Sequence, residues 1–79
     1  MPATNVDQLQ ANEVELMVFV IDEFAKKHQL KFLQAYNYLH LHGGLHFLKK
    51  HYEIEHTLPF DEILSDVAQV CRNKGGMII

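Results

Sequence analysis

Features that mark secreted, membrane-spanning and catalytic proteins are scarce in this sequence. Cys71 is the only cysteine among 79 residues, which excludes a disulfide within one chain and favours a reducing cytoplasm. The longest apolar run, Leu16 to Ile21, is far shorter than the roughly 20 residues that a membrane-spanning helix needs. The N-terminal stretch MPATNVDQLQ lacks the basic and apolar regions of a signal peptide. We therefore expect a cytoplasmic protein without a membrane segment.

Basic residues and catalytic motifs are also few. Seven basic and ten acidic side chains give a formal net charge of −3, which argues against a surface that binds nucleic acid phosphates. The sequence contains no phosphate-binding glycine loop, no G-x-S-x-G and no H-E-x-x-H. A bundle of this size also has little room to enclose a substrate. We expect no enzymatic activity, no cofactor and no nucleic acid partner.

Apolar residues recur every three or four positions in four segments, and no segment shows the two-residue alternation of a strand. This pattern predicts an all-α fold, a small bundle of four helices of which the third is short. The expected helices cover residues 12–28, 31–41, 45 to between 52 and 54, and 59–74. Gly43-Gly44 and Thr57-Leu58-Pro59 are expected to break the chain between the last three.

The domain organisation follows from the same pattern. Residues 1–11 are polar and are expected to form a flexible N-terminal arm. Residues 12–76 are expected to form a single helical domain, and residues 77–79 an apolar C-terminal tail. Asn12 is expected to cap the first helix, because its side chain can accept a hydrogen bond from an unpaired amide of the first turn.

The first helix is predicted to be apolar over more than one face. Leu16, Phe19 and Val20 widen its apolar surface beyond the stripe that a single core would need. A helix of this kind is either central in its domain or shared with a partner. We predict that these three residues contact a partner, which is either a second copy of the chain or another protein.

Five of the six histidines lie between residues 40 and 56, which raises the possibility of a metal site. The spacing is unfavourable: His42 and His46 are four residues apart, but Gly43-Gly44 lies between them. Cys71 falls on the apolar stripe of the last helix, as a small buried hydrophobic residue would. We predict helix-surface histidines and no metal. A ligand- or metal-binding domain that uses residues 40–56 is the alternative.

The stretch Tyr52-Glu53-Ile54-Glu55-His56-Thr57 precedes the last helix and concentrates polar residues at a corner. Thr57 is predicted to cap the last helix. Tyr52 is predicted to bury its ring and to bond its hydroxyl to a polar partner, which Glu53 or His56 could supply. Acid–base chemistry is a further possibility. The four residues Tyr52, Glu53, His56 and Thr57 form either a structural corner or a binding surface, and the sequence leaves both open.

These residues also carry a family resemblance. Phe19-Val20-Ile21-Asp22-Glu23-Phe24 and the Y-E-x-x-H-T string at residues 52–57 resemble a family of small bacterial domains of unknown function. The double glycine before His46 departs from the pattern. Some members of that family are encoded beside toxin-like proteins, so the resemblance implies a small cytoplasmic adaptor or an antitoxin-like partner. The resemblance also implies that a corner or a binding surface is formed by Tyr52, Glu53, His56 and Thr57.

Overall fold

The helical pattern of the sequence is realised in five helices. The computed structural model describes the backbone of residues 2–76 and the side chains of residues 12–76. The helices are α1 (Pro2–Lys27), α2 (Phe32–Leu41), α3 (Gly44–Lys50), α4 (Tyr52–Glu55) and α5 (Phe60–Asn73), and residues 2–76 contain no strand. The predicted all-α class is confirmed. No helix in this part of the chain combines the length and the apolar character needed to cross a membrane.

Two predicted helix boundaries are wrong. The first helix starts at Pro2 and not at Asn12, which lies in its interior. Proline suits the first helical position because its missing N–H would be unpaired there. The third predicted helix is divided at His51, whose φ of −109° and ψ of 24° separate α3 from α4. The independent motion predicted for residues 1–11 stays a prediction, and the apolar tail 77–79 lies outside the described residues.

The double glycine breaks the chain as predicted. Gly43 has a φ of +80°, a left-handed conformation that residues with a Cβ atom rarely adopt. It stands between the end of α2 and the first residue of α3. The turn lets α3 leave at an angle to α2, and α3 then packs against α5.

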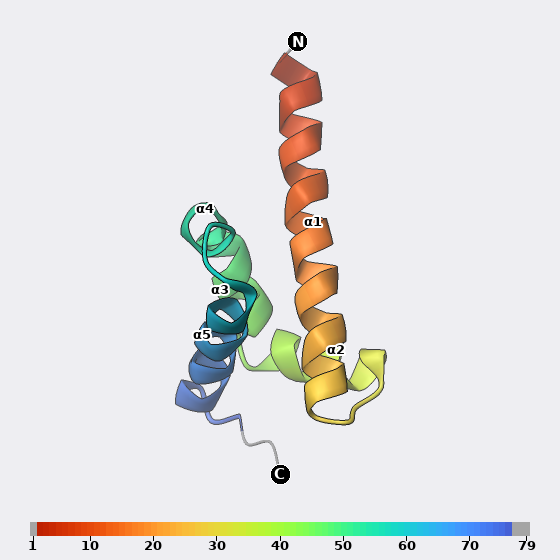
Figure 1. The fold of residues 1–79 in the computed structure, drawn as a ribbon, viewed down its shortest axis with the longest axis vertical. Coiled ribbons are helices and arrows are strands. Elements are labelled where there is room, and N and C mark those ends of the chain that lie inside the picture. The colour runs from red at the N-terminus through yellow and green to blue at the C-terminus, as the bar shows by residue number, and fades with distance from the viewer. Residues whose placement is uncertain (1, 77–79) are drawn as a thin grey trace.

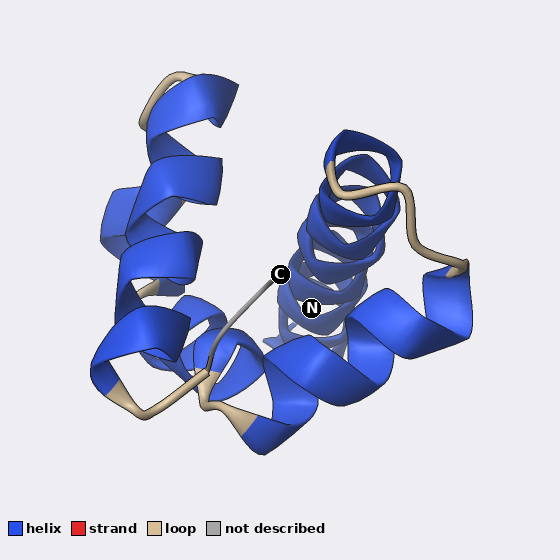
Figure 2. Ribbon diagram, turned by 90° about the horizontal axis from the view of Figure 1, so that it is seen from below, coloured by secondary structure: helices blue, strands red, loops and turns tan. Residues whose placement is uncertain are grey.

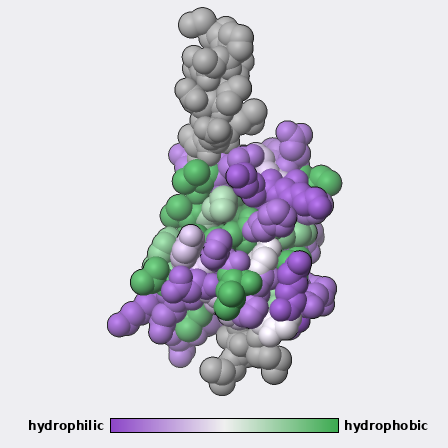
Figure 3. Space-filling model, turned by 180° about the vertical axis from the view of Figure 1, so that it is seen from behind, coloured by the Kyte–Doolittle hydropathy of each residue, from purple (hydrophilic) through white to green (hydrophobic). Residues whose placement is uncertain are grey.

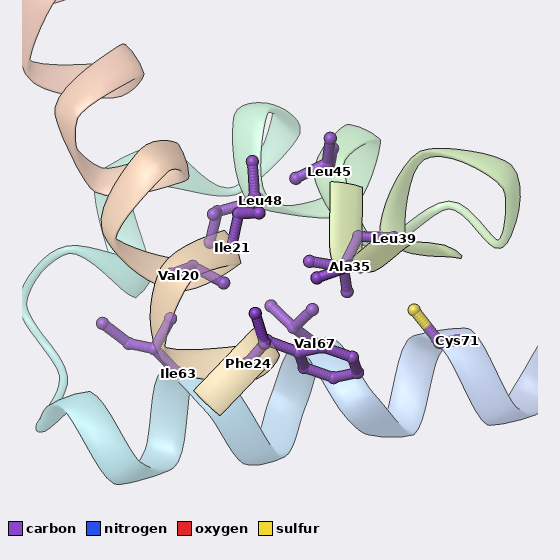
Figure 4. Packing of buried hydrophobic residues seen from close by; sticks show 11 residues of the cluster. Val20, Ile21, Phe24, Ala35, Leu39, Leu45, Leu48, Ile63, Val67 and Cys71 are labelled. Carbon is purple, nitrogen blue, oxygen red and sulfur yellow. The ribbon is translucent and has the colours of Figure 1, made fainter. Parts of the chain in front are cut away.

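The core lies where α1, α2, α3 and α5 meet. Figure 4 shows buried side chains from these four helices converging on one centre. The cluster consists of Val20, Ile21, Phe24, Ala25, Ala35, Leu39, Leu45, Leu48, Ile63, Val67 and Cys71. Cys71 is fully buried, as its place on the apolar stripe predicts. The shortest helix, α4, adds no apolar residue to this centre.

The arrangement leaves one end of α1 beyond the body of the protein. Figure 1 shows the N-terminal part of α1 extending past the other helices, and the molecule measures 47 × 22 × 22 Å. Seen along its long axis, α1 and α5 lie on either side of the centre (Figure 2). Among the described side chains of α1, those in the core belong to residues 20–25, and several of those before residue 20 are exposed.

Gly44 allows α3 and α5 to approach closely, and this leads to a stability prediction. A Cβ atom at Gly44 would lie 2.9 Å from Cys71 Sγ, 3.0 Å from Val67 Cγ1 and 3.2 Å from Leu39 Cδ2. Gly44→Ala is therefore expected to lower the free energy of unfolding by about 1–2 kcal/mol through overpacking. Urea denaturation followed by circular dichroism measures this loss. The same change in a Cys71→Ala background should cost less, because the sulfur is gone; equal losses would contradict the steric cause.

Candidate functional site

The predicted corner is built around the single turn of α4. Tyr52 is half-buried, and its ring stacks on that of His56 with centroids 4.7 Å apart and planes 17° apart. The two residues are four positions apart and so share one side of the turn. Glu53 and His56 are exposed. The structure thus brings Tyr52 and His56 together, while Glu53 makes no ion pair or side-chain hydrogen bond within the described part of the chain.

The role predicted for Thr57 is wrong. Its hydroxyl donates a hydrogen bond of 2.7 Å to the carbonyl oxygen of Ile54, so it satisfies an acceptor at the end of α4. The position before α5 is taken by Pro59, which provides no side-chain cap. The physical reason is that the chain turns directly after α4: the backbone amides of Thr57 and Leu58 donate to the carbonyl oxygens of Ile54 and Glu55, so Thr57 stays on the α4 side of the loop. Thr57 closes the corner from the α4 side.

Glu55 is the polar residue of the corner that sequence reasoning missed. It is only 4% exposed, whereas its neighbour Ile54 is 63% exposed. Its Oε1 atom is buried without a hydrogen-bond partner. A buried carboxylate without a donor is costly, so the surroundings of Glu55 are expected to favour its protonated form.

Two carboxyl groups of α5 explain how Glu55 is tolerated. Burial, a side-chain hydrogen bond with Asp66 and the negative charges of Asp66 and Glu62 together raise the pKa of Glu55 from 4.5 to about 7. A hydrogen bond between two carboxyl groups requires that one of them keeps its proton. The Glu55–Asp66 pair therefore shares one proton below neutral pH and loses it as the pH rises through about 7.

The clue to this pair in the sequence is faint. Glu62 and Asp66 are four residues apart and so share one face of the predicted last helix. The third acidic residue, Glu55, lies in the segment before that helix. A helix of four residues shows no apolar period, so nothing in the sequence indicates that Glu55 points inward and Ile54 outward.

The histidines are paired with aromatic rings and do not converge. Five of the six pack on an aromatic side chain four residues earlier, with ring centroids 4.5–5.7 Å apart. The pairs are Phe24–His28, Tyr36–His40, Tyr38–His42, Phe47–His51 and Tyr52–His56. Among the described side chains, no three His, Cys, Asp or Glu residues are placed to hold a metal ion. The repeated aromatic-x-x-x-His spacing is visible in the sequence and is the signal that predicts these pairs.

The three predicted interface residues of α1 have different surroundings. Val20 is fully buried in the core, so its assignment to a partner interface is corrected: it faces the core and not a partner. Leu16 is half-buried and packs against the core. Phe19 is 50% exposed, and its ring lies 4.4 Å from that of Phe60. Of the three, Phe19 has the largest area available to a partner.

Phe19 belongs to a larger apolar surface, which we call the α1 face. It consists of Val14, Val18 and Phe19 on α1 together with Phe32 on α2, which are 44–56% exposed. These residues line a shallow groove of about 420 Å³ that Glu15 and Asp22 also border. Figure 3 shows apolar surface running down one side of the molecule directly below the grey atoms.

Comparison with known families adds one finding. The model of the family described as "Protein of unknown function (DUF3791)" matches residues 15–74. The chain belongs to the DUF3791 family. Neither the comparison with curated proteins nor that with solved structures gives a match.

The DUF3791 match covers the parts of the chain that form the core and the corner. It spans the second half of α1 and continues to the last helix, so Phe19, the Glu55–Asp66 pair and the Tyr52–His56 pair all lie inside it. Membership of a family of unknown function agrees with the resemblance described above. The Y-E-x-x-H-T string as a mark of the family and the toxin-like neighbours stay predictions.

Proposed function

We propose that this DUF3791 protein is a non-catalytic protein-interaction domain that binds its partner through the α1 face. The observation that carries the proposal is the exposure of Val14, Val18, Phe19 and Phe32 around one groove. Contiguous apolar surface of this kind is typical of interaction sites. The core is already complete without these side chains, so they are available to a second molecule.

The border of the α1 face indicates what kind of surface fits it. Glu15 is exposed, and Asp22 is bonded to Lys26 at 3.2 Å. An apolar helix flanked by lysine or arginine side chains would match this groove in both shape and charge. A second copy of the chain would bring its own Glu15 and Asp22 to the same contact, which adds repulsion between like charges.

The biological setting is part of the same proposal. The resemblance to small bacterial domains supports an adaptor or antitoxin-like role beside a toxin-like partner. The lone buried Cys71 is consistent with a reducing cytoplasm. We assign no nucleic acid, membrane or cofactor to the protein, and the Tyr52–Thr57 corner then serves to hold α4 against α5.

Val18→Asp is expected to abolish association while leaving the fold intact. Val18 is 46% exposed, so a carboxylate there stays hydrated in the free chain but would be buried in a complex. Sedimentation velocity of the chain at micromolar concentration, alone and mixed with an amphipathic helical peptide flanked by lysine residues, measures association, and circular dichroism measures the fold. Leu41→Asp, at an α2 residue that is 77% exposed and outside the groove, is the matched control and should associate like the natural chain. Equal effects of the two variants would count against the α1 face.

Salt dependence separates the two kinds of partner. If two copies associate through the α1 face, salt screens the repulsion between their acidic borders, and association strengthens as ionic strength rises. If the partner carries basic residues, the complex weakens as ionic strength rises. A natural chain that stays monomeric at every salt concentration excludes self-association and leaves the basic partner.

A further inference from the structure

A second hollow, which shares no lining residue with the α1 face, has a different character. It has a volume of about 120 Å³ and lies between the C-terminal end of α1 and the middle of α5. Its apolar wall comes from Phe24, Leu64 and Ala68. Its polar border is formed by Lys27, His28, Ser65 and Arg72.

Two permanent positive charges border this hollow in a chain of negative net charge. Lys27 and Arg72 are both exposed, and neither forms a salt bridge with another described side chain. The neighbouring Lys26 is different, because it is bonded to Asp22 and Glu23. Arg72 donates one hydrogen bond of 2.9 Å to the Oε1 atom of Gln69, which leaves most of its five N–H donors for another acceptor.

His28, the residue that follows α1, completes the polar border. Its ring is half-buried against that of Phe24, with centroids 4.5 Å apart. Burial lowers the pKa of His28, and the positive charge of Lys27 lowers it further. The imidazole is therefore neutral at physiological pH and offers one N–H donor. An anion beside it would act in the opposite direction and favour its protonated form.

The C-terminal end of α1 repels an anion less than a helix end with unpaired carbonyl groups would. The carbonyl oxygens of Phe24, Ala25 and Lys26 accept hydrogen bonds from the backbone amides of His28, Leu30 and Gln29. These bonds satisfy acceptors that would otherwise add negative potential near the hollow.

We propose that this hollow is a binding site for a tetrahedral oxyanion of phosphate size, held by Lys27, His28, Arg72 and the hydroxyl group of Ser65. The volume of the hollow limits the size of the ligand that it can hold. It exceeds several times the roughly 10–15 Å³ that one water molecule needs, yet it is well below the roughly 300 Å³ at which sites for drug-sized ligands begin. Only the oxyanion enters; any group esterified to it remains outside.

Titration with inorganic phosphate, followed by two-dimensional NMR, tests the site. Sodium chloride of equal ionic strength is the reference, because it controls for general screening. We expect saturable shifts at residues of α1 and α5 that line the hollow, and an increase in the pKa of the His28 imidazole when phosphate is present. Absence of saturable shifts at millimolar phosphate would overturn the proposal.

Two double variants provide matched charge changes. Lys27→Gln with Arg72→Gln removes both permanent charges from the border, and both side chains are exposed, so the fold should persist. This variant should bind phosphate at least about tenfold more weakly, which corresponds to about 1.4 kcal/mol. Lys49→Gln with Lys50→Gln removes the same charge from α3 and should bind like the natural chain. Equal weakening in both variants would assign the effect to net charge and overturn the site.

O-phosphoserine distinguishes the two sources of such an anion. Tighter binding of O-phosphoserine than of inorganic phosphate identifies a phosphorylated side chain as the source. Equal or weaker binding identifies the free anion. Either result supports the site, and binding of neither overturns it.

Discussion

Val20→Asp is expected to unfold the protein at room temperature. Val20 is fully buried where α1 meets the other helices, and Figure 4 shows it among the core side chains. A carboxylate there would have no partner and no water, which costs several kcal/mol. Small domains have only about 5–15 kcal/mol of stability in total. Circular dichroism should show loss of helix, and thermal unfolding should lose its cooperative transition.

Val18→Asp on the same helix is the control for this experiment. Val18 lies two residues from Val20 but is 46% exposed, so its aspartate should remain hydrated and the chain should stay helical. The contrast tests the orientation of α1 directly. A folded Val20→Asp protein with impaired association would place Val20 in an interface and contradict the core described above.

Glu55→Gln is expected to change how stability depends on pH. The pKa of Glu55 is raised from 4.5 to about 7 in the folded protein, so the folded state binds this proton more tightly than the unfolded state. The contribution is fully present below about pH 4.5 and is lost as pH rises through about 7. Glutamine keeps a hydrogen-bond donor toward Asp66 without a charge. The variant should therefore exceed the natural chain in stability by about 2–3 kcal/mol at about pH 8.

Urea denaturation at about pH 5 and about pH 8 measures this difference. Near pH 5 the two proteins should be similar, because Glu55 is then protonated in the folded natural chain. Glu53→Gln removes the same formal charge from an exposed position of α4 and should not reproduce the effect. A constant difference between Glu55→Gln and the natural chain at both pH values would exclude the shared proton.

The sequence predicts the helices well where an apolar period is long enough to read. The last helix is the clearest case, with Ile63, Val67 and Cys71 buried at four-residue steps. The start of α1 was missed because residues 2–11 have no apolar period, although nothing after Pro2 interrupts a helix there. A segment without an amphipathic pattern can still be helical. The missing pattern indicates that no other element packs against that segment.

The candidate site was harder to predict than the helices. Val14, Val18, Phe19 and Val20 give α1 apolar residues on every side, so only the packing of the other helices decides that Val20 faces inward. At the corner, hydropathy alone would bury Ile54 and expose Glu55, and the structure has the reverse. The direction of a four-residue helix is set by the turns that flank it, and these depend on tertiary contacts.

The six histidines allow the protein to change the sign of its net charge between neutral and acidic pH. Protonation of all six histidines would change the formal charge of the chain from −3 to +3, and the isoelectric point near 6.0 lies within that change. Acid would therefore reverse the electrophoretic direction of the molecule.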